Sequence, residues 1–186
     1  MDKRIAVLTL IFLLPISTFS QPEKLIDIDG NVYKTIKIGN QIWMAENLKA
    51  TKLNDGTQII YVTDKLTWSK STMPAYCWDN NDERDKNKKY GALYNWYTVE
   101  TGKLCPIGWH VPTDRIGTPK PYIPVGYRDE NGSFWLVKNR SSIWTSTEYS
   151  NYQAYHTVVF FDNSQAQREF ADKKYGIPVR CVKDFK

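Results

Sequence analysis

Short runs of β-branched and aromatic residues, separated by tight-turn pairs, are the feature that most limits what this chain can fold into. The alternating stretch 26–29 ends at Gly30-Asn31, and the stretch 32–38 ends at Gly39-Asn40. Gly and Asn accept the left-handed backbone conformation that two-residue hairpin turns require. The pattern therefore predicts short antiparallel strands joined by hairpins. Further strand candidates in the C-terminal third are 142–147, 155–161, 166–170 and 177–182.

Helical signals are few in this sequence. The clearest covers 91–101, where apolar residues recur at i, i+3 and i+4 before Gly102 ends the pattern. A shorter helix is expected over 63–69, with Thr63 or Asp64 as its N-cap. Together with the strand candidates, these signals predict an α+β fold of mostly short antiparallel strands with one main helix at about 91–101.

Residues 21–186 are predicted to form a single domain, because two domains of this combined length would each be too small to bury a core. Four prolines fall within 111–125. Each proline fixes φ and removes a backbone N–H donor, which neither a helix nor a central strand tolerates at this density. An irregular proline-rich loop is therefore expected at 111–125.

Residues 1–20 are typical of a secretory signal peptide. Lys3 and Arg4 precede the apolar run 5–16, and small residues precede a cleavage site after Ser20. A run of about a dozen apolar residues is shorter than the ~20 that cross a bilayer. A buried N-terminal helix is the less favoured alternative. Cleavage would leave a mature chain without a membrane span, secreted, periplasmic or at the cell surface.

Export would place the 3 cysteines in an oxidising environment, where disulfides persist. Cys105 and Cys181 are predicted to pair, which closes a loop of about 76 residues and is worth roughly 4 kcal/mol in the chain-entropy model. Cys77 lies between Tyr76 and Trp78 and is predicted to be a buried free thiol.

Several sequence blocks follow one another in a definite order. The opening block, 33–48, reads YKTIKIGNQIWMAENL. The central blocks read YGALYNW at 90–96 and CPIGWHVPT at 105–113. The ending blocks are GYR at 126–128, WTSTEY at 144–149 and YGIPVRCV at 175–182.

In this order the blocks resemble the Fibrobacter succinogenes major paralogous domain family over nearly the whole mature chain. The resemblance implies an exported bacterial protein with a fold similar to C-type lectins and formylglycine-generating enzymes. The family has no assigned reaction, and the resemblance suggests adhesion or carbohydrate-associated roles.

The chain departs from the family pattern after the block that ends at 113. Family members continue there into a second helix, whereas this chain passes through the proline-rich loop directly to 126–128. The missing helix would leave apolar surface exposed. One alternative is that another chain covers that surface, in which case the protein would form an oligomer. The other is that the domain is a reduced and less stable version of the family fold.

Candidate groups for metal binding or catalysis are sparse. His110 and His156 are the only histidines, and no Cys-x-x-Cys occurs, so no metal site is predicted. The polar run 79–87 fails the calcium-loop template because Arg84 stands where Gly is required, and a solvated loop is expected there. A Cys105–His110 dyad would need the thiol that the predicted disulfide consumes. The sequence therefore predicts no enzyme and no cofactor.

Aromatic residues make up 14% of the chain and supply the remaining candidate site. Trp135, Tyr149 and Tyr152 lie at predicted strand ends or turns, where exposure is expected. Arg128 and Glu148 lie nearby in the sequence. A ring can cover the apolar face of a sugar while polar groups bond its hydroxyls, so these five residues are predicted to bind ligand; ordinary surface aromatics are the alternative. The tryptophans expected in the core are Trp43, Trp96, Trp109 and Trp144.

Three functional classes remain after these exclusions. The leading hypothesis is an exported, non-catalytic binding or adhesion module that recognises a carbohydrate (glycan) or another cell-surface ligand. The alternative is a structural subunit of a cell-surface assembly that docks through the side left uncovered by the missing helix. An enzyme is the weakest hypothesis because no acid–base pair is evident, and Glu148 has no partner carboxylate. The net charge of +5 comes from scattered basic residues, so no nucleic-acid partner is expected.

Overall fold

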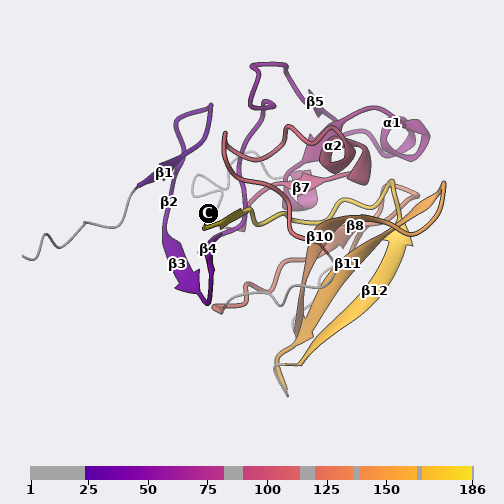
Figure 1. Cartoon of the computed structure of the whole chain (residues 1–186). Helices are drawn as coiled ribbons and strands as arrows, with labels where there is room; N and C mark the ends of the chain where they lie inside the picture. Colours follow the sequence, from indigo (N-terminus) through magenta and orange to yellow (C-terminus); the bar gives the residue numbers. More distant parts are fainter. Residues whose placement is uncertain (1–23, 82–89, 114–119, 136–138, 163–164, 186) are drawn as a thin grey trace, which may run out of the picture.

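The computed structural model describes residues 24–81, 90–113, 120–135, 139–162 and 165–185. The predicted signal peptide, most of the polar run 79–87 and part of the proline-rich loop lie outside the described residues. Figure 1 shows the last long strands as a twisted sheet beside two short helices, with the N-terminal strands on the other side of the view.

The described residues form five small sheets. The helices are α1 (Lys65–Lys70) and α2 (Trp96–Glu100), and a 3-10 turn, η1, covers Asp79–Asn81. The strands are β1 (Leu25–Ile26), β2 (Val32–Tyr33), β3 (Thr35–Ile38), β4 (Gln41–Met44), β5 (Ile60–Tyr61), β6 (Ala75–Cys77), β7 (Leu93–Tyr94), β8 (Tyr127–Arg128), β9 (Phe134–Trp135), β10 (Arg140–Glu148), β11 (Gln153–Phe160), β12 (Ala166–Asp172) and β13 (Val182–Asp184).

The predicted α+β fold class is wrong, because the structure has no main helix at 91–101. Only the five residues of α2 are helical within 91–101. Gly91 has a left-handed φ of 82°, and a Cβ there would lie 2.5 Å from that of Asn47. The next residues form β7, which pairs with β6, and Asn95 then caps α2 by accepting a hydrogen bond from the Thr98 amide. A strand followed by one helical turn produced the helix-like apolar spacing, and the result is a β-rich fold rather than an α+β, C-type-lectin-like one.

The short strands and hairpins expected from the turn pairs are present. The β3–β4 hairpin closes at Gly39-Asn40 with Ile38 opposite Gln41, and β1 pairs with β2. The C-terminal candidates appear as the antiparallel sheet β10-β11-β12. The predicted strand 177–182 is wrong in extent, because only its last residue belongs to β13. Helix α1 follows the expected cap, with Asp64 accepting from the Thr67 amide.

Tryptophan side chains anchor the main core beneath β10. Trp144 is fully buried, and its indole N–H donates to the Tyr94 carbonyl at 2.8 Å. Trp96 is also buried and donates to the Thr145 carbonyl at 2.9 Å. Trp43 is buried as expected, whereas Trp109 packs against the core from a partly exposed position.

Cys105 and Cys181 form the predicted disulfide, across a sequence separation of 76 residues. The bond joins the turn that precedes Trp109 to the segment leading into β13. Backbone hydrogen bonds between His110 and Val182 continue this connection. Cys77 is a buried free thiol, and burial raises its pKa to about 12.

His156 is a buried histidine on β11 that faces the core. It lies opposite Trp144 in the β10–β11 register, edge-on to the indole at 5.8 Å. Its Nδ1 has no hydrogen-bond partner among the described residues. Burial lowers its pKa to about 4, and the charge of Arg140 acts in the same direction.

Acidification is expected to destabilise the fold through His156. The unfolded histidine takes up a proton near its ordinary pKa of 6.5, whereas the folded one stays neutral until about pH 4. Stability is therefore lost as pH falls through this window, by about 2 kcal/mol between pH 7.5 and pH 5. Urea unfolding at both values measures the loss. His156→Leu should remove most of it and His110→Gln should not; an undiminished loss in His156→Leu would assign it to other groups.

Candidate functional site

An exposed cluster of three rings lies on the β10-β11-β12 sheet. Tyr155 and Phe170 are directly opposite each other in the β11–β12 register, so their side chains share one face. Tyr149 packs flat on Phe170, with ring centroids 4.5 Å apart, and edge-on to Tyr155 at 5.1 Å. Tyr149 is 48% exposed and Phe170 is 50% exposed. We call Tyr149, Tyr155 and Phe170 the aromatic patch.

Local backbone geometry brings Tyr149 to this face. The β10–β11 register shifts between Trp144 and Glu148, and such bulges redirect the side chains that follow them. The amides of Tyr149 and Ser150 both donate to the Gln153 carbonyl, which closes the hairpin. The patch is thus held by paired strands and a closed turn.

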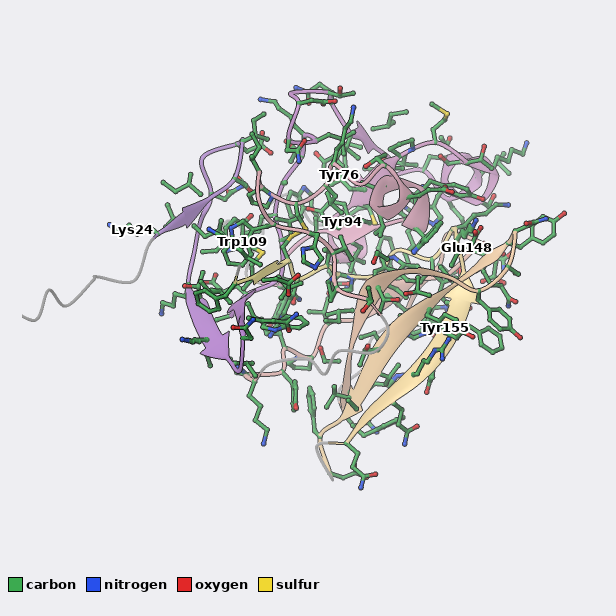
Figure 2. All side chains as sticks on the ribbon, viewed as in Figure 1. Lys24, Tyr76, Tyr94, Trp109, Glu148 and Tyr155 are labelled. Atoms are coloured by element: carbon green, nitrogen blue, oxygen red, sulfur yellow. A yellow bond between two sulfur atoms is a disulfide. The ribbon has the colours of Figure 1, made fainter. Side chains whose placement is uncertain are left out.

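Two polar groups lie beside the patch. The exposed guanidinium of Arg168 covers the Tyr155 ring at 3.4 Å from its centroid. Glu148 is bonded to the ammonium of buried Lys173, which also lies 4.7 Å from the centre of the Trp96 ring. Figure 2 shows Tyr155 along the sheet and Glu148 near its upper end. The predicted site residue Glu148 therefore lies near the patch as the partner of Lys173.

Tyr152 and Trp135 are exposed, as expected, but they do not join the patch through any ring contact among the described residues. Tyr152 lies in the β10–β11 turn, where its carbonyl accepts from the Lys173 amide. Trp135 lies on β9 opposite Tyr127 and donates to the Asp129 carboxylate at 2.7 Å.

Arg128 is not a surface residue, so its predicted ligand contact is corrected. Its side chain is 1% exposed. Its guanidinium donates to the carbonyls of Val62 at 2.6 Å, Thr63 at 2.9 Å and Gly132 at 3.1 Å. These bonds hold two distant loops together, and they give Arg128 a structural role that its place in the sequence did not reveal.

Tyr155 and Phe170 are the patch residues that the sequence analysis missed. Both lie inside predicted strands, and their pairing depends on the register of β11 with β12. The usable signal was that an aromatic residue occurs near the far end of each arm of a predicted hairpin. Such residues come opposite each other when the arms pair from the turn outward.

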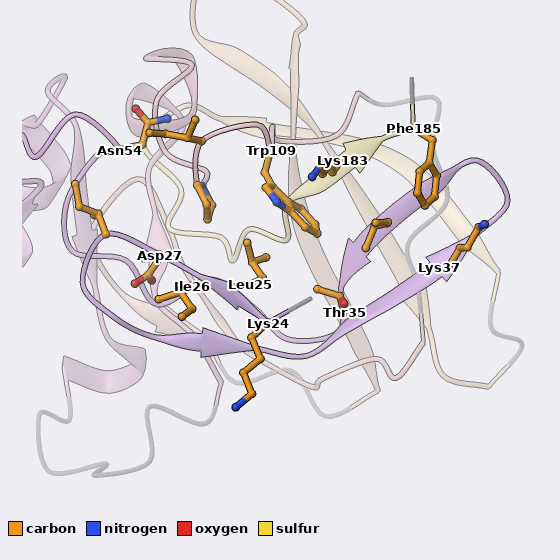
Figure 3. Close-up of a pocket in the computed structure, with 14 residues that line it drawn as sticks. Lys24, Leu25, Ile26, Asp27, Thr35, Lys37, Asn54, Trp109, Lys183 and Phe185 are labelled. Carbon is orange, nitrogen blue, oxygen red and sulfur yellow. The ribbon is translucent and has the colours of Figure 1, made fainter. Parts of the chain in front are cut away.

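A groove of about 980 Å³ is a second candidate site, and it lies away from the patch beside β1, β3 and β13. Figure 3 shows Trp109 and Leu25 facing its interior, with Lys37 and Phe185 at one end. The sequence does not indicate this groove, because Trp109 was expected in the core.

Two features are absent from the described residues: a side-chain cluster that could hold a metal ion and a helix that could cross a membrane. No group of three or more His, Cys, Asp or Glu side chains there could hold a metal ion. No helix among the described residues is long and apolar enough to cross a membrane.

Residues 36–115 match the family model of the Fibrobacter succinogenes major domain. That stretch of the chain is a domain of this family. The matched stretch runs from β3 through α2 and past the Cys105 turn, and it includes Lys37, Ile42 and Trp109 of the groove. The aromatic patch lies outside the match. No curated protein and no solved structure, of a C-type lectin or of any other fold, matches the chain.

Proposed function

We propose that this protein is an exported, non-catalytic binding module that recognises a carbohydrate through the aromatic patch. The observation that carries the proposal is the half-exposed pair Tyr149 and Phe170, stacked on a paired sheet with Tyr155. An apolar sugar face can lie against such rings. Arg168, beside them, supplies N–H donors suited to sugar hydroxyls.

The size of the patch sets the expected affinity. An aromatic side chain carries about 150–250 Å² of surface, so the half-exposed parts of Tyr149 and Phe170 together offer on the order of 200 Å². Covering that area yields about 5 kcal/mol, most of which the cost of association offsets. One site should therefore bind weakly, and an adhesive role would depend on several copies acting together.

Removal of the stacked rings is expected to abolish carbohydrate binding. A panel of soluble polysaccharides in native affinity electrophoresis would identify a retarding ligand for the wild-type protein. Tyr149→Ala and Phe170→Ala should each weaken that retardation at least tenfold, because each removes half of the exposed surface.

Phe185→Ala is the matched control, since Phe185 is also an exposed ring but lies on the groove. It should retain full binding. Trp135→Ala tests the predicted site residue that lies on β9, outside the patch. Unchanged retardation in the Tyr149→Ala, Phe170→Ala double variant, or a panel in which nothing binds, would refute the proposal.

A further inference from the structure

The floor of the groove is one face of the β13-β4-β3 sheet. The strand registers place Lys183, Ile42 and Lys37 in one row across the three strands. Trp109 and Phe185 also line the groove, and Figure 3 shows Lys37 beside Phe185, with 4.6 Å between the ammonium and the ring centre. The floor is therefore apolar at Ile42, between two lysines whose backbones are about 10 Å apart, which is two strand spacings.

Most of the charged residues that line the groove are positive. Lys24, Lys37 and Lys183 are the basic lining residues, and Asp27 is the only acidic one. The Asp27 carboxylate already accepts four hydrogen bonds, two from amides, one from the Asn31 side chain and one from the Tyr33 hydroxyl at 2.6 Å. Asp27 is thus committed to the fold, and the lysines favour an anionic occupant.

The β3 strand beside this groove has an open edge. It is the last strand of its sheet, and no other described strand pairs with its outer side. The tight turn at Gly39-Asn40 directs the backbone groups of Ile36 toward β4 and those of Thr35 and Lys37 away from it. The Lys34 carbonyl, two residues before Ile36, also points toward the β4 side, where it accepts a hydrogen bond from the Ala45 amide.

Both faces of this edge strand are accessible. Ile36 is 39% exposed and Ile38 is 43% exposed, on the side opposite Thr35 and Lys37. Native proteins usually cover or charge such edges, because their unpaired backbone groups are a template for another strand. Only one of the four β3 residues is charged.

We propose that the open edge of β3 binds an extended acidic peptide of a partner protein as an added strand. Side chains of β3 point alternately to the groove and to the opposite face, so the side chains of the bound peptide must alternate in the same way. Acidic side chains of the peptide face the lysines of the groove, and its β-branched apolar side chains lie beside Ile36 and Ile38. Backbone hydrogen bonds supply affinity and the alternate side chains supply specificity. A second copy of this chain fits less well, because it would bring like-charged lysines together. The proposal is independent of carbohydrate binding at the aromatic patch.

A fluorescently labelled, end-capped peptide of sequence Thr-Val-Glu-Val-Glu-Val-Thr tests this assignment by fluorescence anisotropy. The wild-type protein should bind it saturably at one peptide per chain. The matched peptide with Lys in place of Glu should bind at least tenfold more weakly. Lys37→Glu should reverse this preference, which a merely damaged fold would not do.

Two further variants separate strand addition from general charge attraction. Thr35→Pro removes an outward N–H while sparing the β4 ladder, and it should weaken binding of the Glu peptide at least tenfold. Lys70→Glu makes the same charge change as Lys37→Glu but lies on exposed α1, away from the groove in Figure 1, and should leave binding unchanged.

Three results would overturn the proposal. The first is no saturable binding of the Glu peptide at millimolar concentration. The second is an equal loss of affinity in Lys70→Glu and Lys37→Glu, which would indicate non-specific attraction. The third is a dimer of the protein alone, detected by light scattering and lost in Thr35→Pro, which would assign the edge to a second copy.

Discussion

The double substitution Cys105→Ala, Cys181→Ala is expected to lower the free energy of unfolding by about 4 kcal/mol. The disulfide closes a loop of 76 residues, so its removal gives the unfolded chain much greater freedom. Its contacts in the folded state should survive, because hydrogen bonds between His110 and Val182 still connect the same segments. Urea denaturation, followed by tryptophan fluorescence, measures the difference.

Two comparisons make this result specific to the disulfide. The wild-type protein in a strong thiol reductant should approach the stability of the double variant, whereas the double variant should not respond to the reductant. Cys77→Ala also removes a buried sulfur, but that sulfur makes no cross-link, so it should cost on the order of 1 kcal/mol. Three free thiols in the native wild-type protein, found by mass spectrometry, would contradict the expectation.

The sequence predicted correctly the turn and the helix cap that depend only on residues close by in the chain. The turn at Gly39-Asn40 and the cap at Asp64 are local, because a left-handed backbone or a free amide is satisfied within a few residues. The strand β7 was missed for the opposite reason. Tyr94 exchanges backbone hydrogen bonds with Ile177, a residue far along the chain, and this pairing overrides the helical spacing around it.

The candidate sites likewise combine features set by nearby residues with features set by contacts between distant parts of the chain. Tyr149 was foreseen as exposed from its position at a turn, but its stacking on Phe170 depends on how two strands pair. Trp109 was expected inside, and its partial exposure arises because the sheet face beside it is left open as a groove. Burial of an individual ring depends on what packs over it, which composition does not specify.

Arg128 is the clearest case in which tertiary contacts reverse an expectation, and its removal should be costly. Its guanidinium is enclosed between the rings of Trp68, 4.6 Å from the ring centre, and Phe134, at 4.8 Å. Arg128→Met fills much of the same space but leaves the carbonyls of buried Val62 and Gly132 without this donor, whereas the Thr63 carbonyl still accepts from the Asn81 side chain. Each buried unsatisfied group costs about 1–3 kcal/mol, so we expect a loss of at least about 3 kcal/mol in the free energy of unfolding.

A positive charge at position 128 should not by itself restore the free energy of unfolding. Arg128→Lys keeps the cation but lacks the planar fork that reaches three carbonyls at once, so it should recover less than half of the loss. Arg140→Met is the matched control, because Arg140 is only partly buried and lies 5.9 Å from the Tyr127 ring centre; it should cost less than about 1 kcal/mol. Urea unfolding at pH 7 ranks the three variants. If Arg128→Met kept wild-type stability while polysaccharide binding was lost, Arg128 would instead be a ligand contact that becomes accessible when the β8–β9 ribbon opens.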